Sequence, residues 1–203
     1  MSTFSSRTIA LDVALLLPPE SVADITQLNA RLSSPPEGFQ FDSSHFPHLT
    51  LAQQFVLNSD LNVILKKLRH LATQYAPIKL SSSGLVASGT TISLRILPSE
   101  QLFELHKKIM GHLEAHITQP GDAQGFFPGG ESARQTDVAW VNNFRDHHSG
   151  FRFEPHITVG KGTLHGQHTT LVCSTSTLAA CHLSRFCTCR HVFESWSLTK
   201  TSS

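Results

Sequence analysis

Charged residues and polar aromatic residues are scarce in this sequence of 203 residues, and their scarcity limits the partners that it can have. Only 15% of the residues are charged, whereas about 25% is usual in a soluble protein. The sequence has one tyrosine and two tryptophans, and its formal net charge is +1 when the histidines are neutral. A charge so close to zero gives no broad electrostatic attraction for a duplex nucleic acid.

Long apolar runs are also absent. The most apolar stretch, residues 9–17, is interrupted by Asp12 and ended by Pro18 and Pro19. It therefore resembles neither a secretory signal nor a membrane span. We expect a cytoplasmic protein that makes no contact with a membrane. Because 39% of the residues are apolar, the chain can bury a core, and its length predicts one folded domain over residues 1–203.

The few cysteines lie close together near the end of the sequence, at Cys173, Cys181, Cys187 and Cys189. They contain no C-x-x-C pair, and their spacing matches no common zinc site, so we expect no structural metal. Reduced, partly buried cysteines are the simplest interpretation. A disulfide within the cluster is the alternative.

Hydropathy patterning predicts a mixed α+β chain. Alternating or continuous apolar residues predict strands at residues 8–17, 48–56, 78–82, 85–86, 90–97, 138–141, 154–159 and 186–198. Helical spacing predicts helices at residues 19–32, 60–75, 98–113 and, less clearly because of its threonines, 169–182. No glycine-rich nucleotide-binding loop occurs.

Two segments of the sequence repeat one pattern. Residues 46–52 are Phe-Pro-His-Leu-Thr-Leu-Ala, and residues 154–160 are Glu-Pro-His-Ile-Thr-Val-Gly. Two further His-x-Thr triplets, at His116 and His168, lack the proline and the full apolar pattern around the threonine. The longer repeated pattern is therefore the signal, because a sequence with 13 histidines produces bare triplets by chance.

Strand geometry gives the repeated pattern a chemical meaning. Side chains at positions i and i+2 of a strand share one face, so each histidine is expected beside its threonine, with apolar residues behind. If the two strands are neighbours, one groove receives two imidazoles and two hydroxyls. A neutral histidine can then take a proton from an attacking water while an imidazolium protonates the leaving oxygen. The hydroxyls can donate to phosphate oxygens.

The paired motifs resemble those of the 2H phosphoesterase superfamily, which includes 2′–5′ RNA ligase-like and 2′,3′-cyclic phosphodiesterase proteins. The resemblance covers most of the chain. It implies an α+β fold of two pseudo-symmetric lobes, with mixed or antiparallel sheets lining a central groove and helices outside. It also implies that His48 and His156 form the acid/base pair and that Thr50 and Thr158 bind phosphate. Many relatives carry an arginine soon after the first motif, where this sequence has Gln53.

Four further residues are candidates for substrate binding. Phe46 shares the parity of His48 and is expected either to stack on a base or to belong to the core. Arg95 is expected either to meet a phosphate or to lie on a solvated edge. Arg152 is an even number of residues from His156 and is expected on the same strand face, whereas Lys161 is an odd number of residues away and is expected on the opposite face. The other histidines, including His45, His106, His112, His116, His147 and His148, are expected at the surface.

These observations predict an enzyme that opens the 2′,3′-cyclic phosphate of a nucleotide or an RNA end, as a monomer and without a metal or cofactor. The two motifs are equivalent in sequence, so either histidine fits either role. One alternative is hydrolysis or ligation of 2′–5′ phosphodiester bonds in RNA or oligoadenylate. The other is a nucleotide- or RNA-binding module without turnover.

Overall fold

Alternating apolar residues form strands and amphipathic segments form helices in the computed structural model of the protein, which describes residues 8–34, 36–163 and 169–200. The predicted triplet at His168 begins outside these residues. The strands are β1 (Thr8–Leu16), β2 (His48–Leu57), β3 (Ile78–Ser88), β4 (Thr91–Ile96), β5 (His156–Lys161), β6 (Val172–Thr175), β7 (Thr177–Ser184) and β8 (Thr188–Ser197). The helices are α1 (Pro19–Asn29), α2 (Leu61–Ala72), α3 (Glu100–Leu113) and α4 (Gln135–His147).

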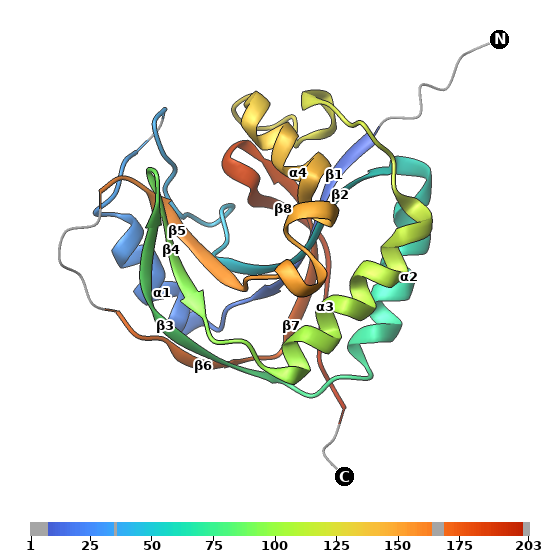
Figure 1. Cartoon of the computed structure of the whole chain (residues 1–203), viewed down its shortest axis with the longest axis horizontal. Helices are drawn as coiled ribbons and strands as arrows, with labels where there is room; N and C mark the ends of the chain where they lie inside the picture. The colour runs from blue at the N-terminus through green and yellow to red at the C-terminus, as the bar shows by residue number, and fades with distance from the viewer. Residues whose placement is uncertain (1–7, 35, 164–168, 201–203) are drawn as a thin grey trace.

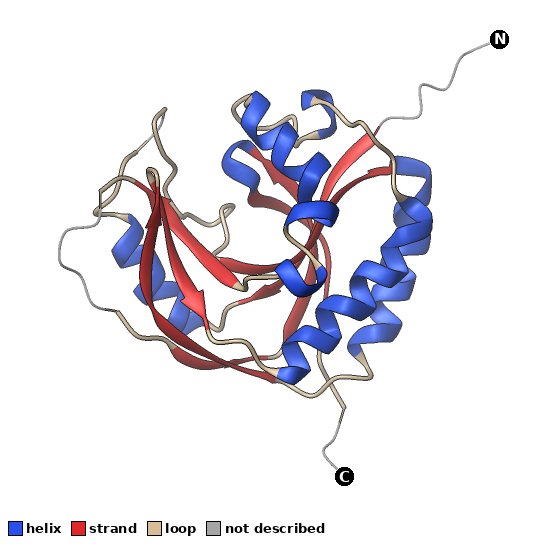
Figure 2. Ribbon diagram, viewed as in Figure 1, coloured by secondary structure: helices blue, strands red, loops and turns tan. Residues whose placement is uncertain are grey.

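The described strands form one curled sheet in the order β6-β3-β4-β5-β2-β1-β7-β8, and all of its pairs are antiparallel (Figure 2). Two halves of the sheet meet where β5 pairs with β2. The predicted α+β fold with antiparallel sheets is therefore confirmed. In the described part of the chain, no helix is long and apolar enough to cross a membrane.

Helices cover both faces of the sheet. Apolar residues of β1 and β2, such as Leu11 and Leu49, form the main core together with residues of α1, α2 and α3. Figure 1 shows α2 and α3 side by side on the outside of the curl. Helix α4 packs on the other face, where Val141 lies in a small cluster with Phe55 and Phe126. His48, Thr50 and Gln53 of β2 share this inner face with α4.

Two of the predicted elements are wrong. Residues 138–141 lie within helix α4 and not in a strand, and residues 169–182 contribute to strands β6 and β7 and not to a helix. The two strand pieces predicted at residues 78–82 and 85–86 are strand, but they belong to the single strand β3. A four-residue apolar run cannot distinguish a strand from a helix. The β-branched threonines and valine of residues 169–182 favour the strands that form there.

The cysteine cluster contains one disulfide, between Cys181 on β7 and Cys189 on β8. Cys173 and Cys187 are free thiols. Cys181 and Cys189 can form this disulfide because β7 and β8 are neighbouring antiparallel strands. For these two cysteines the disulfide alternative therefore holds, and the interpretation as reduced thiols is wrong.

His106 is buried, contrary to the expectation that it lies at the surface. Its Nδ1 donates to the carbonyl of Leu51 over 2.6 Å, and its Nε2 accepts the backbone N–H of Gly150 over 3.0 Å. The ring stacks on Phe153 at 3.9 Å between centroids. His106 therefore ties β2 to the segment that leads into β5. His116 also departs from the expectation, because it is half-buried and lies 2.9 Å from Asp60.

We expect His106→Leu to lower the free energy of unfolding by about 2–3 kcal/mol, because it leaves a buried carbonyl and a buried N–H unpaired. Urea denaturation followed by circular dichroism measures the loss. The control is His112→Leu on the same helix, where the half-buried side chain makes no such bridge and the change should stay within about 0.5 kcal/mol. Equal losses in both variants would contradict the bridging role of His106.

Candidate active site

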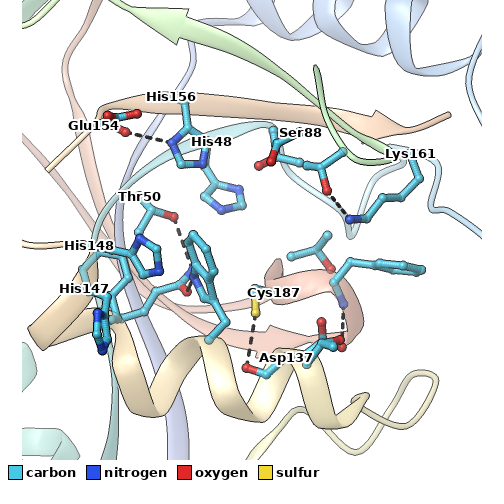
Figure 3. A pocket seen from close by; sticks show the side chains of 18 of the residues that line it. His48, Thr50, Ser88, Asp137, His147, His148, Glu154, His156, Lys161 and Cys187 are labelled. Carbon is cyan, nitrogen blue, oxygen red and sulfur yellow. Dashed lines mark hydrogen bonds between the residues drawn. The ribbon is translucent and has the colours of Figure 1, made fainter. Parts of the chain in front are cut away.

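A pocket with a volume of about 910 Å³ opens on the inner face of the curled sheet, where β2 and β5 meet. Its lining includes the four residues of the repeated motifs, His48, Thr50, His156 and Thr158. Figure 3 shows His48 and His156 at the wall of this pocket and Asp137 of α4 across from them. The structure thus brings the two motifs together.

The pairing of β2 with β5 explains how the motifs meet. Leu49 is the register partner of Ile157 in an antiparallel pair. Continuing this register by one residue places His48 opposite Thr158 and Thr50 opposite His156, all on one face. The two histidines are then diagonal neighbours across the strand pair, a relation in which the Cα atoms are roughly 7 Å apart. Both histidines therefore enter the pocket from the same pair of strands.

A β-bulge follows each motif and changes which side chains face the pocket. The register of β2 against β1 skips Leu51, and the register of β5 against β4 skips Val159. Each bulge reverses the alternation, so Gln53 and Lys161 rejoin the face of their motif histidines and line the pocket. The expected opposite parity of Lys161 is therefore wrong, because simple alternation does not account for the extra residue.

Asn29, at the end of α1, holds the second bulge in place. Its side-chain amide donates to the carbonyls of Val159 over 2.8 Å and Phe39 over 2.9 Å, and its oxygen accepts the N–H of Phe41 over 2.8 Å. The neighbouring residue is glycine because a Cβ at Gly160 would lie 2.9 Å from the Asn29 amide nitrogen. These contacts fix the position from which Lys161 enters the pocket.

Both motif histidines are oriented by the same local hydrogen bond. Nδ1 of His48 lies 2.7 Å from the carbonyl of Phe46, and Nδ1 of His156 lies 2.8 Å from the carbonyl of Glu154. Since a carbonyl only accepts, Nδ1 carries a proton in each ring. The reactive nitrogen of each histidine is therefore Nε2.

The surroundings of the two Nε2 atoms differ. Nε2 of His48 lies 3.1 Å from Oδ2 of Asp12, a fully buried residue of β1. Burial by itself lowers the pKa of His48, but the hydrogen bond and the charge of Asp12 outweigh it, so the pKa is raised above 6.5. Burial and the nearby charge of His48 lower the pKa of His156 below 6.5, against the opposing hydrogen bond to Glu154.

One end of the pocket is cationic. The Arg134 guanidinium pairs with Asp137 at 2.5 Å and lies 4.0 Å from the centre of the Phe186 ring. Lys161 lies 5.7 Å from the same ring and donates to the hydroxyl of Thr91. Burial and the charge of Arg134 lower the pKa of Lys161. An anion bound at this end would relieve that repulsion.

Aromatic and basic residues also line another part of the pocket. His148 stacks on Trp140 at 3.8 Å between centroids and lines the pocket, so its predicted place in a solvated turn is wrong. Arg152 lies in a short turn before β5, lines the pocket, donates to the carbonyl of Asp146 and lies 4.8 Å from the centre of the Phe151 ring. Figure 3 shows His148 and Lys161 on different sides of the motif residues.

Two candidate binding residues lie elsewhere. Phe46 is not among the described residues that line the pocket, and it packs against Ala179, Cys181 and Cys189. Its backbone N–H is held by the carbonyl of Cys189, which turns the segment before β2 toward β8. Arg95 is exposed and is not among the described residues that line the pocket, although it pairs at 3.1 Å with Glu154, which does line it. Strand parity placed both residues on the motif face but could not show where the pocket ends.

Sequence reasoning missed Asp12, Gln53 and Trp140 as members of the site. Asp12 had a usable signal, since it is the one charge in a strand whose other residues predict burial on both faces, and a buried charge needs a partner. Gln53 and Lys161 occupy equivalent positions after the two motifs. Trp140 gave no signal in the sequence, because the apolar pattern does not predict helix α4, which carries it.

The described residues contain no group of three or more histidine, cysteine or acidic side chains that could hold a metal ion. The acidic residues nearest the motifs are instead engaged individually, Asp12 with His48 and Asp137 with Arg134. Imidazoles of this kind can transfer protons, and the hydroxyl and cationic side chains around them can donate hydrogen bonds.

Comparison with known proteins agrees with this arrangement of two motifs in one groove. The family model of the 2′-5′ RNA ligase superfamily matches residues 17–171. The chain belongs to this superfamily, which is a group of 2H phosphoesterases. No curated protein matches the sequence significantly.

Solved structures show that the fold is shared. The protein TT0787 of Thermus thermophilus is 16% identical with a TM-score of 0.60, over 96% of this chain and 100% of that one. LigT of E. coli in complex with ATP is 17% identical with a TM-score of 0.58, over 96% and 100% of the two chains. At such identities the likeness extends to the fold alone.

We expect Asn29→Ala to lower the free energy of unfolding of the protein by about 2–4 kcal/mol, because it removes the buried hydrogen bonds that hold the bulge at Val159. Thermal denaturation measures this change. Asn142→Ala is the control, since that residue is only part-buried where it bridges to Gly121. A larger loss in the control would contradict the role given to Asn29.

Proposed function

We propose that this chain is a phosphodiesterase that hydrolyses the 2′,3′-cyclic phosphate of a nucleotide or an RNA end, with His48 and His156 as its general acid and base. The observation that carries the proposal is that both motif histidines and both motif threonines line one pocket, with Nδ1 of each ring bound to a backbone carbonyl, so that Nε2 is the nitrogen of each ring that is not bound to the backbone. A phosphate ester cleaved without a metal needs this combination of one proton acceptor, one proton donor and neutral hydrogen-bond donors.

The reaction balances with these groups alone. One neutral histidine accepts a proton from water as the water oxygen forms a bond to phosphorus. The other histidine, as imidazolium, gives its proton to the 2′ or 3′ oxygen as the bond from that oxygen to phosphorus breaks. The product is a phosphomonoester, and the two histidines have exchanged protonation states, which solvent restores.

The remaining pocket residues fit a small anionic substrate. Thr158 can donate to a phosphate oxygen, whereas the hydroxyl of Thr50 lies 3.3 Å from Oδ2 of Asp12. Lys161 and Arg134 suit a further negative group, and His148 on Trp140 offers a flat surface to a base or ribose. LigT of E. coli, which shares this fold, has been solved in complex with phosphate, 3′-AMP, ATP and NADP⁺, and this supports a phosphate-containing ligand for the present chain.

Replacement of either histidine tests the assignment. We expect His48→Ala and His156→Ala each to lower kcat for a nucleoside 2′,3′-cyclic phosphate by about 10²–10⁴-fold, because each removes one proton transfer. His70→Ala, exposed on α2, is the control and should retain full activity. Near-normal turnover by either pocket variant would contradict the proposed roles.

Chelation tests the metal-free mechanism. Because protons are moved by imidazoles, we expect full activity after dialysis against EDTA, measured by chromatography of the nucleotide product. A loss of activity that added divalent cation restores would contradict the mechanism.

Product analysis separates the alternative functions. Hydrolysis of a cyclic phosphate yields a single monophosphate, whereas activity on 2′–5′ linkages would appear only with oligoadenylate or RNA substrates. Retention of 3′-AMP with no turnover of any of these substrates would favour a binding module and overturn the proposal.

A further inference from the structure

Asp12 is a buried carboxylate that the proton transfers described above do not use. It is 0% exposed on β1, where its register partners are Gln53 on β2 and Cys181 on β7. Its Oδ1 has no hydrogen-bond partner among the described residues, so Oδ2 makes its contacts. A buried carboxylate of this kind is costly unless an opposite charge lies beside it.

A chain of hydrogen bonds with defined directions leads to this carboxylate. The indole of Trp140 can only donate, and it donates to Oε1 of Gln53 over 3.0 Å. This contact fixes the Gln53 amide, whose nitrogen then faces the hydroxyl of Thr50 at 3.4 Å. Because that hydroxyl accepts from Gln53, its own proton is free to point to Oδ2 of Asp12, 3.3 Å away.

The direction of the chain determines where the proton lies between Asp12 and His48. Oδ2 accepts from Thr50, as a carboxylate oxygen does, and also faces Nε2 of His48 at 3.1 Å. The Nδ1 of His48 already donates to the carbonyl of Phe46. His48 therefore holds a proton on both nitrogens, and it supplies the one ion pair of Asp12 in the described part of the chain.

His156 has no equivalent of Asp12 within the residues that the structure describes. The carboxylate of Glu154 is exposed and pairs with Arg95, while His156 contacts only the backbone carbonyl of Glu154. The other titratable groups that influence His156 are His48 on β2 and His148 after α4, both of which disfavour a second positive charge. The Nε2 of His156 is thus left with a free lone pair.

We propose that Asp12 is a positioning residue that holds His48 as the imidazolium, making His48 the general acid and leaving His156 as the general base. This inference rests on the proposed function. Without substrate the Nε2–H of His48 faces Asp12. In the reaction the leaving oxygen approaches the same Nε2–H, the N–H bond breaks as that oxygen gains the proton, and an Nε2–H bond forms on His156 as water loses one. The uncompensated charge of Asp12 then draws a proton from solvent back to His48.

Histidine titration by NMR in the intact wild-type protein tests the order of the two groups without any substrate. Signals are assigned with His48→Asn and His156→Asn. We expect His48 to titrate above 6.5 and His156 below it, in agreement with the directions in which their surroundings move the two pKa values. The reverse order would overturn the assignment.

Asp12→Asn tests the cause, because it keeps the volume and removes the charge. We expect the pKa of His48 to fall by about one unit or more, since a neighbouring opposite charge is worth about 1–3 pH units. In the bell-shaped profile of kcat/KM, the alkaline limb should move to lower pH by the same amount while the acid limb, set by His156, stays in place. At a pH above both limbs, kcat/KM should fall about tenfold for each pH unit that the alkaline limb moves.

Asp137→Asn is the matched control, a buried carboxylate of the same pocket that pairs with Arg134 and contacts neither motif histidine. It should leave the pKa values of His48 and His156 unchanged. If Asp12→Asn does not fold, Asp12→Ser replaces it, because it also removes the negative charge beside Nε2 of His48 and should lower the pKa of His48 in the same direction. An unchanged pKa of His48 in the folded variant, or movement of the acid limb alone, would overturn the inference.

Failure of the inference can be told apart from failure of the proposed function. A protein whose histidines titrate in the expected order but which opens no 2′,3′-cyclic phosphate overturns the proposed function and, with it, the role of general acid. Full activity with the reverse order of titration overturns the assignment to His48 alone.

Discussion

The backbone pairing of β2 with β5 at Leu49 and Ile157 joins the two halves of the sheet, and the pocket depends on it. Without this contact the two histidine motifs would lie on separate edges of two four-stranded sheets. With it, an approximate twofold relation places each histidine opposite the threonine of the other motif. His106 and Asn29 support the arrangement from outside, the first by tying β2 to the segment before β5 and the second by holding the bulge after Thr158.

This nearly symmetric frame carries an unsymmetric set of charges. The first half brings a buried carboxylate, Asp12, to its histidine and a neutral side chain, Gln53, to the position after the bulge. The second half brings a cation, Lys161, to the equivalent position. Its histidine makes the same backbone contact as His48 but pairs with no carboxylate among the described residues. A reaction that needs one acid and one base benefits from such a difference, because two identical histidines would compete for the same proton.

The sequence predicts the catalytic chemistry better than the boundaries of the pocket. The motif positions, their shared face and the α+β class follow from local pattern, because the period of a strand determines which side chains are neighbours. The positions of Lys161, Phe46 and Arg95 do not follow from local pattern. A β-bulge changes which face Lys161 occupies. Phe46 and Arg95 lie beyond the end of the pocket, which depends on how other elements cover the strands. The apolar pattern predicts a strand within what is helix α4, and it therefore misses the contacts of His148 and Trp140.

A crystal structure of the wild-type protein with inorganic phosphate or a nucleoside monophosphate product tests the central claim most directly, namely that both histidines act on one phosphorus atom. The account predicts phosphate oxygens within about 3 Å of Nε2 of both His48 and His156, with the hydroxyl of Thr158 donating to the same group. A phosphate held only by Lys161 and Arg134, with neither imidazole in contact, would contradict it.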